Sequence, residues 1–181
     1  MSDSDLGKKL IEEMDLEPFL DEYEHVTSTK MTIITPSERP DFICERKSRF
    51  VGVELVRVME DPAQREWRII LGEHEQLEGS DAAMLIQKAV YQKEEKRAST
   101  GWKYPDRTIL VVQLIGGDGK DAATYIDSEL MDEMSSTGFK EIWVADYSQI
   151  SPYGTVQLVG VKPKRWRGFH PHRFYGTKPY G

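Results

Sequence analysis

The most regular alternation of apolar and polar positions lies between residues 50 and 58, and it predicts a strand. Val51, Val53 and Leu55 would share one face of this strand, with Glu54 on the other. The residues before it predict a partner strand and a charged turn, so the segment reads as a hairpin. These preceding segments are a strand or extended lead-in at 31–35, a loop at 36–40, a strand at 41–45 and the turn at 45–49.

Apolar residues spaced three and four apart predict helices in three parts of the chain. Asp5 is placed to cap the first helix, and Pro18 to interrupt it before a second short turn. The predicted helices span residues 6–24, Ser80 to near Gly101, and 120–136.

A nearly continuous β-branched apolar run at residues 108–115 predicts a central strand covered on both faces. Shorter strands are predicted at 67–71, after the Asp61-Pro62 break, and at 141–145 and 155–161. Because strands alternate with helices, the sequence predicts an α/β sandwich with a mixed sheet.

The composition fits one globular domain, since 181 residues with 39% hydrophobic and 30% charged residues can bury a core. No apolar run reaches the roughly 20 residues that a membrane helix needs. The acidic start of the chain lacks the apolar region of a secretory signal, so we expect a cytoplasmic protein without a membrane partner. Cys44 is the sole cysteine, which excludes an internal disulfide and a Cys-x-x-Cys metal site.

Charge is distributed unevenly along the chain. The formal net charge is −7, yet six of the 24 basic residues lie at or beyond Lys162, where there is no acid. We therefore divide the chain into an α/β domain at 1–161 and a basic, aromatic tail at 162–181. Cations interleaved with rings suit the binding of phosphates and bases, and equally suit packing on the acidic body of the protein.

Two further motifs favour structural interpretations. Gly116 to Lys120 is glycine-rich but lacks the spacing of a phosphate-binding loop, so we expect a tight turn that begins a helix. His170 and His172 have no third ligand at a suitable spacing, so we expect them to belong to the tail rather than to a metal site.

A pair of acids carries the strongest chemical signal. Glu54 lies in mid-strand among valines, where an ionised carboxylate is costly unless it is paired or binds a metal. Asp41 follows Pro40 at the start of the neighbouring strand, so the two side chains could approach each other on one sheet face. Mg²⁺ or Mn²⁺ between them would suit hydrolysis of a phosphodiester bond.

The segments Glu38-Arg39-Pro40-Asp41-Phe42 and Val51-Gly52-Val53-Glu54 resemble the PD-(D/E)xK nuclease superfamily, in particular bacterial members with a Pro-Asp-Phe … Gly-(Ile/Val)-Glu signature. The resemblance covers residues 38–96. It implies a restriction-endonuclease-like αβα sandwich, in which a central mixed sheet is flanked by helices. It also implies Mg²⁺-dependent cleavage of DNA, with Asp41 and Glu54 as metal ligands. RNA as a substrate and a homodimer both stay open.

The position of the superfamily's usual lysine, two residues after the second acid, is occupied by Val56. Some superfamily members are similar in placing this lysine on the following helix. Lys93 lies two turns beyond Ile86 and so shares the buried face of that helix, which makes it the predicted catalytic cation. Lys96, one turn further on, is the second choice.

Additional site residues are less strongly indicated. Gln87-x-x-x-Tyr91 resembles an element of RecB-like members, and residues at this spacing are neighbours on a helix. Glu38, or one of Glu12 and Glu13 on the first helix, could supply a third acid.

The sequence therefore leads to two hypotheses. The first is a metal-dependent nuclease in which Asp41 and Glu54 hold Mg²⁺ or Mn²⁺ and Lys93 is the catalytic cation. The second is a catalytically decayed binding or assembly module with the same fold, acting through its basic aromatic tail; Val56 at the usual lysine position favours it.

Overall fold

One mixed sheet of seven strands forms the centre of the described chain, which comprises residues 2–72, 76–148, 150 and 154–171 of this computed structural model. The order of the strands across the sheet follows their order in the sequence. The strands are β1 (Met31–Pro36), β2 (Phe42–Arg46), β3 (Arg49–Val58), β4 (Thr108–Leu114), β5 (Glu141–Asp146), β6 (Gln157–Lys162) and β7 (Gly168–His170).

The sheet has an antiparallel part at each side and a parallel part in the middle. β1, β2 and β3 are antiparallel, β3, β4 and β5 are parallel, and β6 and β7 are antiparallel to their neighbours. Every residue of β4 is buried, which confirms the central strand predicted from its apolar run. The predicted hairpin is confirmed as well, since β2 pairs with β3 across a turn at Lys47 and Ser48.

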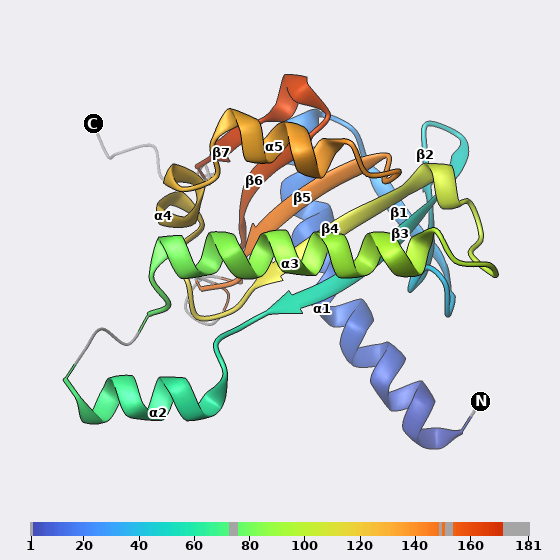
Figure 1. Cartoon of the computed structure of the whole chain (residues 1–181). Helices are drawn as coiled ribbons and strands as arrows, with labels where there is room; N and C mark the ends of the chain where they lie inside the picture. Colours follow the sequence, from blue (N-terminus) through green and yellow to red (C-terminus); the bar gives the residue numbers. More distant parts are fainter. Residues whose placement is uncertain (1, 73–75, 149, 151–153, 172–181) are drawn as a thin grey trace, which may run out of the picture.

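Helices cover both faces of this sheet (Figure 1). Buried residues of α1 pack on the face that carries Val51 and Val53, whereas α3, α4 and α5 pack on the face that carries Val58. A mixed sheet flanked by helices confirms the predicted α/β class. The helices are α1 (Asp3–Thr27), α2 (Pro62–Ile70), α3 (Gly79–Arg97), α4 (Gly119–Thr124) and α5 (Ser128–Ser135), with 3₁₀ turns η1 (Pro105–Arg107) and η2 (Lys164–Trp166). In the described residues no helix is both long and apolar enough to cross a membrane.

α1 differs from the helix predicted at its position. Its cap is Ser2, whose Oγ accepts from the Asp5 N–H at 3.2 Å, while the Asp5 carboxylate accepts from the Ser2 N–H at 3.1 Å. The prediction of Asp5 as the cap is therefore wrong by three residues. Pro18 lies inside the helix without ending it, because burying Leu16 and Phe19 against the sheet outweighs the hydrogen bond that proline cannot make.

The strand predicted at 67–71 is wrong, because these residues belong to the helix α2 and its end. Asp61 Oδ1 accepts from the Ala63 N–H at 2.8 Å, and Pro62 occupies the first turn. These two helix-start signals prevail over the strand propensity of the apolar run. In Figure 1, α2 projects away from the sheet.

The single helix predicted at 120–136 is wrong too, because the segment forms two short helices. Asp118 caps α4 by accepting from the Lys120 N–H at 2.8 Å. Asp127 caps α5 by accepting from the Leu130 N–H at 2.9 Å. The second cap starts a new helix in mid-segment, which an apolar spacing of three and four residues does not reveal. The turn predicted at Gly116 to Lys120 is confirmed.

The start of α3 is also corrected. Ser80 lies inside the helix, and Glu78 at the cap position makes no capping hydrogen bond through its side chain. The Gly79 N–H instead donates to Asp121 Oδ2 at 3.0 Å, so a residue of α4 satisfies the first turn of α3.

The first part of the basic, aromatic tail packs on the domain. β7 pairs with β6, and Arg167 Nη1 donates to Asp132 Oδ1 at 2.7 Å on α5. His170 lies near the Trp143 ring, with Nε2 2.7 Å from the Trp166 carbonyl oxygen. His172 and the remainder of the tail lie outside the described residues.

Candidate functional site

The predicted acid pair meets at the edge of β3. β2 begins at Phe42, which pairs with Val53, so β2 offers no backbone partner to the residues of β3 that follow. The Leu55 N–H instead donates to Asp41 Oδ2 at 2.9 Å. The Asp41 N–H donates to Glu54 Oε2 at 3.0 Å. These two bonds between backbone and side chain hold both carboxylates beside the edge of the strand.

Lys93 on α3 reaches this acid pair. Its Nζ donates to Glu54 Oε1 at 2.6 Å, and the two side chains are only 18% and 6% exposed. Burial raises the pKa of Glu54, and the negative charge of Asp41 raises it further, while the bond from Lys93 opposes both effects. Val56, two residues after Glu54, is partly buried and packs against the apolar core beneath α3. The structure thus places an ammonium group beside the acids by way of the helix.

α1 contributes a second lysine and a third acid. Lys9 Nζ lies 3.6 Å from Asp41 Oδ1 and 3.0 Å from Glu12 Oε2. The latter oxygen is buried and accepts no hydrogen bond of normal geometry from the described residues. Glu12 is therefore the α1 acid that faces the pair, whereas Glu13 lines a separate pocket beside β1.

A cleft of about 700 Å³ opens beside Asp41, and we call it the acid cleft. Its walls come from α1, β3, β4 and α3, which are distant in sequence but adjacent in the fold. Lys93 and Arg57 line it together with acidic side chains of α1. This mixture of anionic and cationic groups suits a bound phosphate whose charge is shared between a cation and lysine.

Asp41, which lines the acid cleft, and Glu54 beside it are the carboxylates that would hold a divalent cation that keeps several waters. Mg²⁺ is usually held by one or two carboxylates together with water and substrate phosphate. Asp41 and Glu54 supply two carboxylates, and a cation would relieve the repulsion between them. Glu12 Oε2, which is paired with Lys9 at 3.0 Å, is a further carboxylate oxygen in the same cleft. In the described ranges no group of three or more His, Cys, Asp or Glu side chains is arranged to hold a metal alone.

The other residues singled out in the sequence lie away from the acid pair. Lys96 is exposed on α3 and does not line the acid cleft. Gln87 is half-buried one turn before Tyr91, whose hydroxyl donates to Glu133 on α5 at 3.1 Å. Glu38 is exposed in the loop before β2 and lines the pockets next to the acid cleft. Among the predicted residues, the structure brings Asp41, Glu54 and Lys93 together.

Cys44 has no features of a reactive group. It is fully buried in the core between α1 and the sheet, and burial raises its pKa to about 12. A thiol with so high a pKa is a poor nucleophile.

Lys9 and Gln113 are the residues near the site that the sequence did not reveal. Lys9 precedes Glu12 by three positions, so the two are neighbours on α1, but no local pattern shows which face of α1 meets the acid pair. Gln113 is a buried polar residue of β4 that lines the acid cleft. A polar residue in an otherwise apolar central strand is the signal that could have identified it.

Comparisons with protein-family models, with curated proteins and with solved structures found no match to this chain.

Proposed function

We propose that the protein is a cytoplasmic, metal-dependent nuclease with a restriction-endonuclease-like fold, and that it hydrolyses phosphodiester bonds of DNA. The observation that carries the proposal is the 2.6 Å bond from Lys93 Nζ to Glu54 Oε1, next to the bonded pair of Asp41 and Glu54. Two acids and one lysine beside an open cleft suit metal-assisted phosphodiester hydrolysis.

Asp41 and Glu54 would hold Mg²⁺ or Mn²⁺, with Glu12 as a further acceptor. The cation, when bound, would activate water for attack and neutralise charge on the scissile phosphate. Deprotonated Glu54 is the form that binds a cation, and Lys93 favours this form by donating to it.

Lys93 has a second role in this proposal. Its ammonium group is fixed by the bond to Glu54 and lines the acid cleft. From there it can orient the attacking water and donate to a phosphate oxygen as negative charge develops. Since Lys93 enters from α3, the apolar residue Val56 at the usual lysine position does not deprive the site of a cation.

The test is cleavage of supercoiled plasmid and of labelled oligonucleotides with Mg²⁺ or Mn²⁺. We expect wild type to cleave, and Glu54→Gln and Lys93→Met to lower the initial rate by about 100-fold or more. Lys88→Met is the matched control, because Lys88 is exposed on the same helix. Circular dichroism and thermal unfolding of each variant separate loss of chemistry from loss of fold. Equal rates for wild type and Glu54→Gln would refute the catalytic proposal.

The alternative is a decayed binding module that acts through the basic tail, and Val56 is the observation that favours it. Titration calorimetry with Mn²⁺ distinguishes the two functions. The nuclease proposal expects a binding signal that disappears in Asp41→Asn. A wild-type protein that binds no Mn²⁺ at millimolar concentration would favour the binding module.

A further inference from the structure

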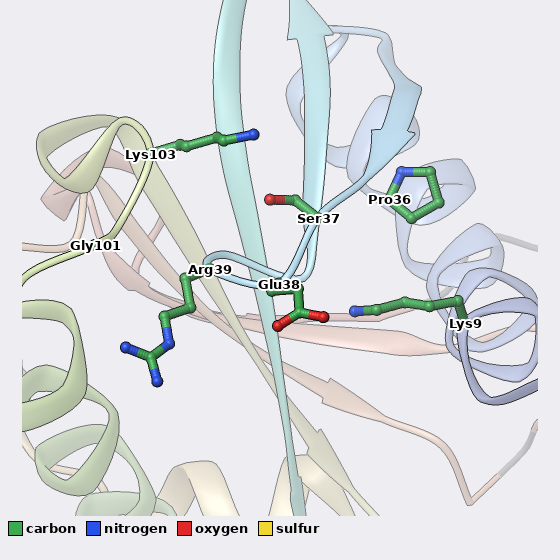
Figure 2. Close-up of a pocket in the computed structure, with 7 residues that line it drawn as sticks. All are labelled: Lys9, Pro36, Ser37, Glu38, Arg39, Gly101 and Lys103. Atoms are coloured by element: carbon green, nitrogen blue, oxygen red, sulfur yellow. The ribbon is translucent and has the colours of Figure 1, made fainter. Parts of the chain in front are cut away.

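A second pocket, of about 480 Å³, lies between the loop before β2, the loop after α3, and α1. Figure 2 shows Lys9 entering from α1 on one side and Lys103 on the other, with Glu38 and Arg39 on the loop between them. We call it the basic pocket, because three cations and one acid line it in a chain whose net charge is −7. Such a local reversal of charge favours an anionic ligand.

Two of the three cations are available to a ligand. Lys9 is committed to Asp41 and Glu12. The Arg39 guanidinium and the Lys103 ammonium, by contrast, have no ion-pair or hydrogen-bond partner among the residues that the structure describes. Two unpaired cations that line one pocket from neighbouring loops are a natural receptor for phosphate oxygens.

Backbone contacts fix the walls of the pocket. The Lys103 N–H donates to the Arg39 carbonyl at 2.9 Å, which joins the loop after α3 to the loop before β2. Pro40 packs so closely on Gly52 that a Cβ there would lie 2.4 Å from its ring. The backbone is thus held at the Arg39 carbonyl and at the residue that follows it, so the cost of ordering the backbone on binding is small.

The basic pocket is continuous with the acid cleft. Lys9 lines it and also lies 3.6 Å from Asp41, and a smaller pocket lined by Lys9, Glu38 and Asp41 connects the two. A chain of phosphates lying in the acid cleft could therefore place one phosphate there and another in the basic pocket.

The exposed Phe50 ring near the pocket favours a nucleic acid over a free anion. Tyr104 follows Lys103 and has a φ of 52°, which is unusual for a bulky side chain. Its ring lies 6.2 Å from that of Phe50, which is 44% exposed. Tyr104 is half-buried, with the Arg107 guanidinium 4.8 Å from its ring centre, so Phe50 is the ring of this pair that is exposed for a base to stack on.

We propose that Arg39 and Lys103 bind a phosphate of the nucleic-acid strand outside the scissile position, and so position the strand across the acid cleft. The assignment of the ligand to a nucleic acid rests on the proposed function. The phosphate is either an internal diester or a monoester at the end of a strand, and these two sources can be separated experimentally.

The test is fluorescence anisotropy with labelled single-stranded oligonucleotides of one sequence, in EDTA and in the Glu54→Gln background, so that cleavage does not interfere. We expect Lys103→Ala and Arg39→Ala each to weaken binding by about 5-fold at 0.1 M salt, and to reduce the slope of log affinity against log salt by about 0.7. Lys103→Arg should restore both quantities. Lys120→Ala, which removes an exposed lysine of α4, is the matched control and should change neither.

Three substrates locate the phosphate: one with a 5′-phosphate, one with a 3′-phosphate and one with neither. An equal loss on all three assigns an internal diester to the pocket, and a loss confined to a phosphorylated end assigns a monoester. The proposal is overturned if both pocket variants bind like the control, if wild type binds no oligonucleotide, or if only inorganic phosphate binds. Plasmid cleavage by wild type is scored separately. If wild type cleaves plasmid but the pocket variants bind oligonucleotide as wild type does, the pocket proposal fails and the nuclease proposal stands. If the pocket variants weaken binding but wild type does not cleave, the nuclease proposal fails and the pocket proposal stands.

Discussion

At Glu54, burial and the neighbouring Asp41 oppose the ionised carboxylate, and Lys93 supports it. The balance leaves the pKa of Glu54 above its ordinary value of 4.5. A carboxyl that is costly to ionise in the free protein is stabilised when a cation binds, so proton and metal compete for the same oxygens. The residue is therefore poised to couple metal binding to pH.

This coupling gives a signed prediction for stability. Because the folded pKa of Glu54 is raised, the folded state binds more protons than the unfolded state between pH 4.5 and the raised value. The contribution of Glu54 to the free energy of unfolding should therefore fall as pH increases through this window. Urea unfolding of wild type and Glu54→Gln across pH 4–8, without metal, measures the contribution as a difference between the two proteins.

The comparison with Glu54→Gln is needed because other groups also make the free energy of unfolding depend on pH. Glu94, whose pKa is lowered by Arg97, makes stability rise with pH in both wild type and Glu54→Gln. Saturating Mg²⁺ should reverse the trend in wild type alone, since binding of the cation to the ionised carboxylate adds stability as pH rises. Parallel curves for the two proteins without metal would show that Glu54 titrates normally.

At the scale of elements, a buried polar cluster joins α1, β2 and β5. The Glu141 carboxylate accepts from Tyr23 Oη and from Trp143 Nε1, each at 3.0 Å, and it pairs with Arg46. Burial raises the pKa of Tyr23, and the negative charge of Glu141 raises it further. Because these donors converge on one carboxylate, Glu141 fixes how α1 lies on the sheet, and so where Lys9 and Glu12 enter the acid cleft.

Removing this carboxylate should be costly. We expect Glu141→Ala to lower the free energy of unfolding by about 3–5 kcal/mol, because it leaves the half-buried Arg46 guanidinium without its carboxylate partner, while its hydrogen bond to Tyr23 Oη remains. Urea denaturation monitored by tryptophan fluorescence measures the change. Glu45→Ala, which removes an exposed glutamate of β2, should cost less than about 0.5 kcal/mol. Similar losses for both variants would contradict this role of the cluster.

The same scale shows what the sequence could predict. The hairpin and β4 follow from local patterns, because alternation and a long apolar run each fix which faces are buried. The break between α4 and α5 escaped prediction, since the same apolar spacing continues past the cap at Asp127. Lys9 escaped for a different reason: its role depends on how α1 crosses the sheet, and no local pattern encodes that placement.

At the scale of the whole molecule, basic residues gather in two places, the C-terminal tail and the basic pocket. Part of the basic tail is structural, because Arg167 donates to Asp132 and Ser135 of α5 and to the Val161 carbonyl. Other cations gather in the basic pocket, within an otherwise acidic body. The two functional hypotheses therefore assign nucleic-acid binding to different places, and a truncation can separate them.

A chain that ends after Pro171 keeps every strand and helix described above but lacks Arg173 and Lys178. Under the nuclease proposal, we expect this variant to keep wild-type Mn²⁺ affinity and to cleave DNA within about 2-fold of the wild-type rate. A chain that ends after Val161 should instead be destabilised by several kcal/mol, because it loses β7 and the contacts of Arg167. Calorimetry, cleavage and urea unfolding measure these quantities. If the chain that ends after Pro171 no longer binds nucleic acid but still binds Mn²⁺, the tail is the binding element, and the assignment to the basic pocket fails.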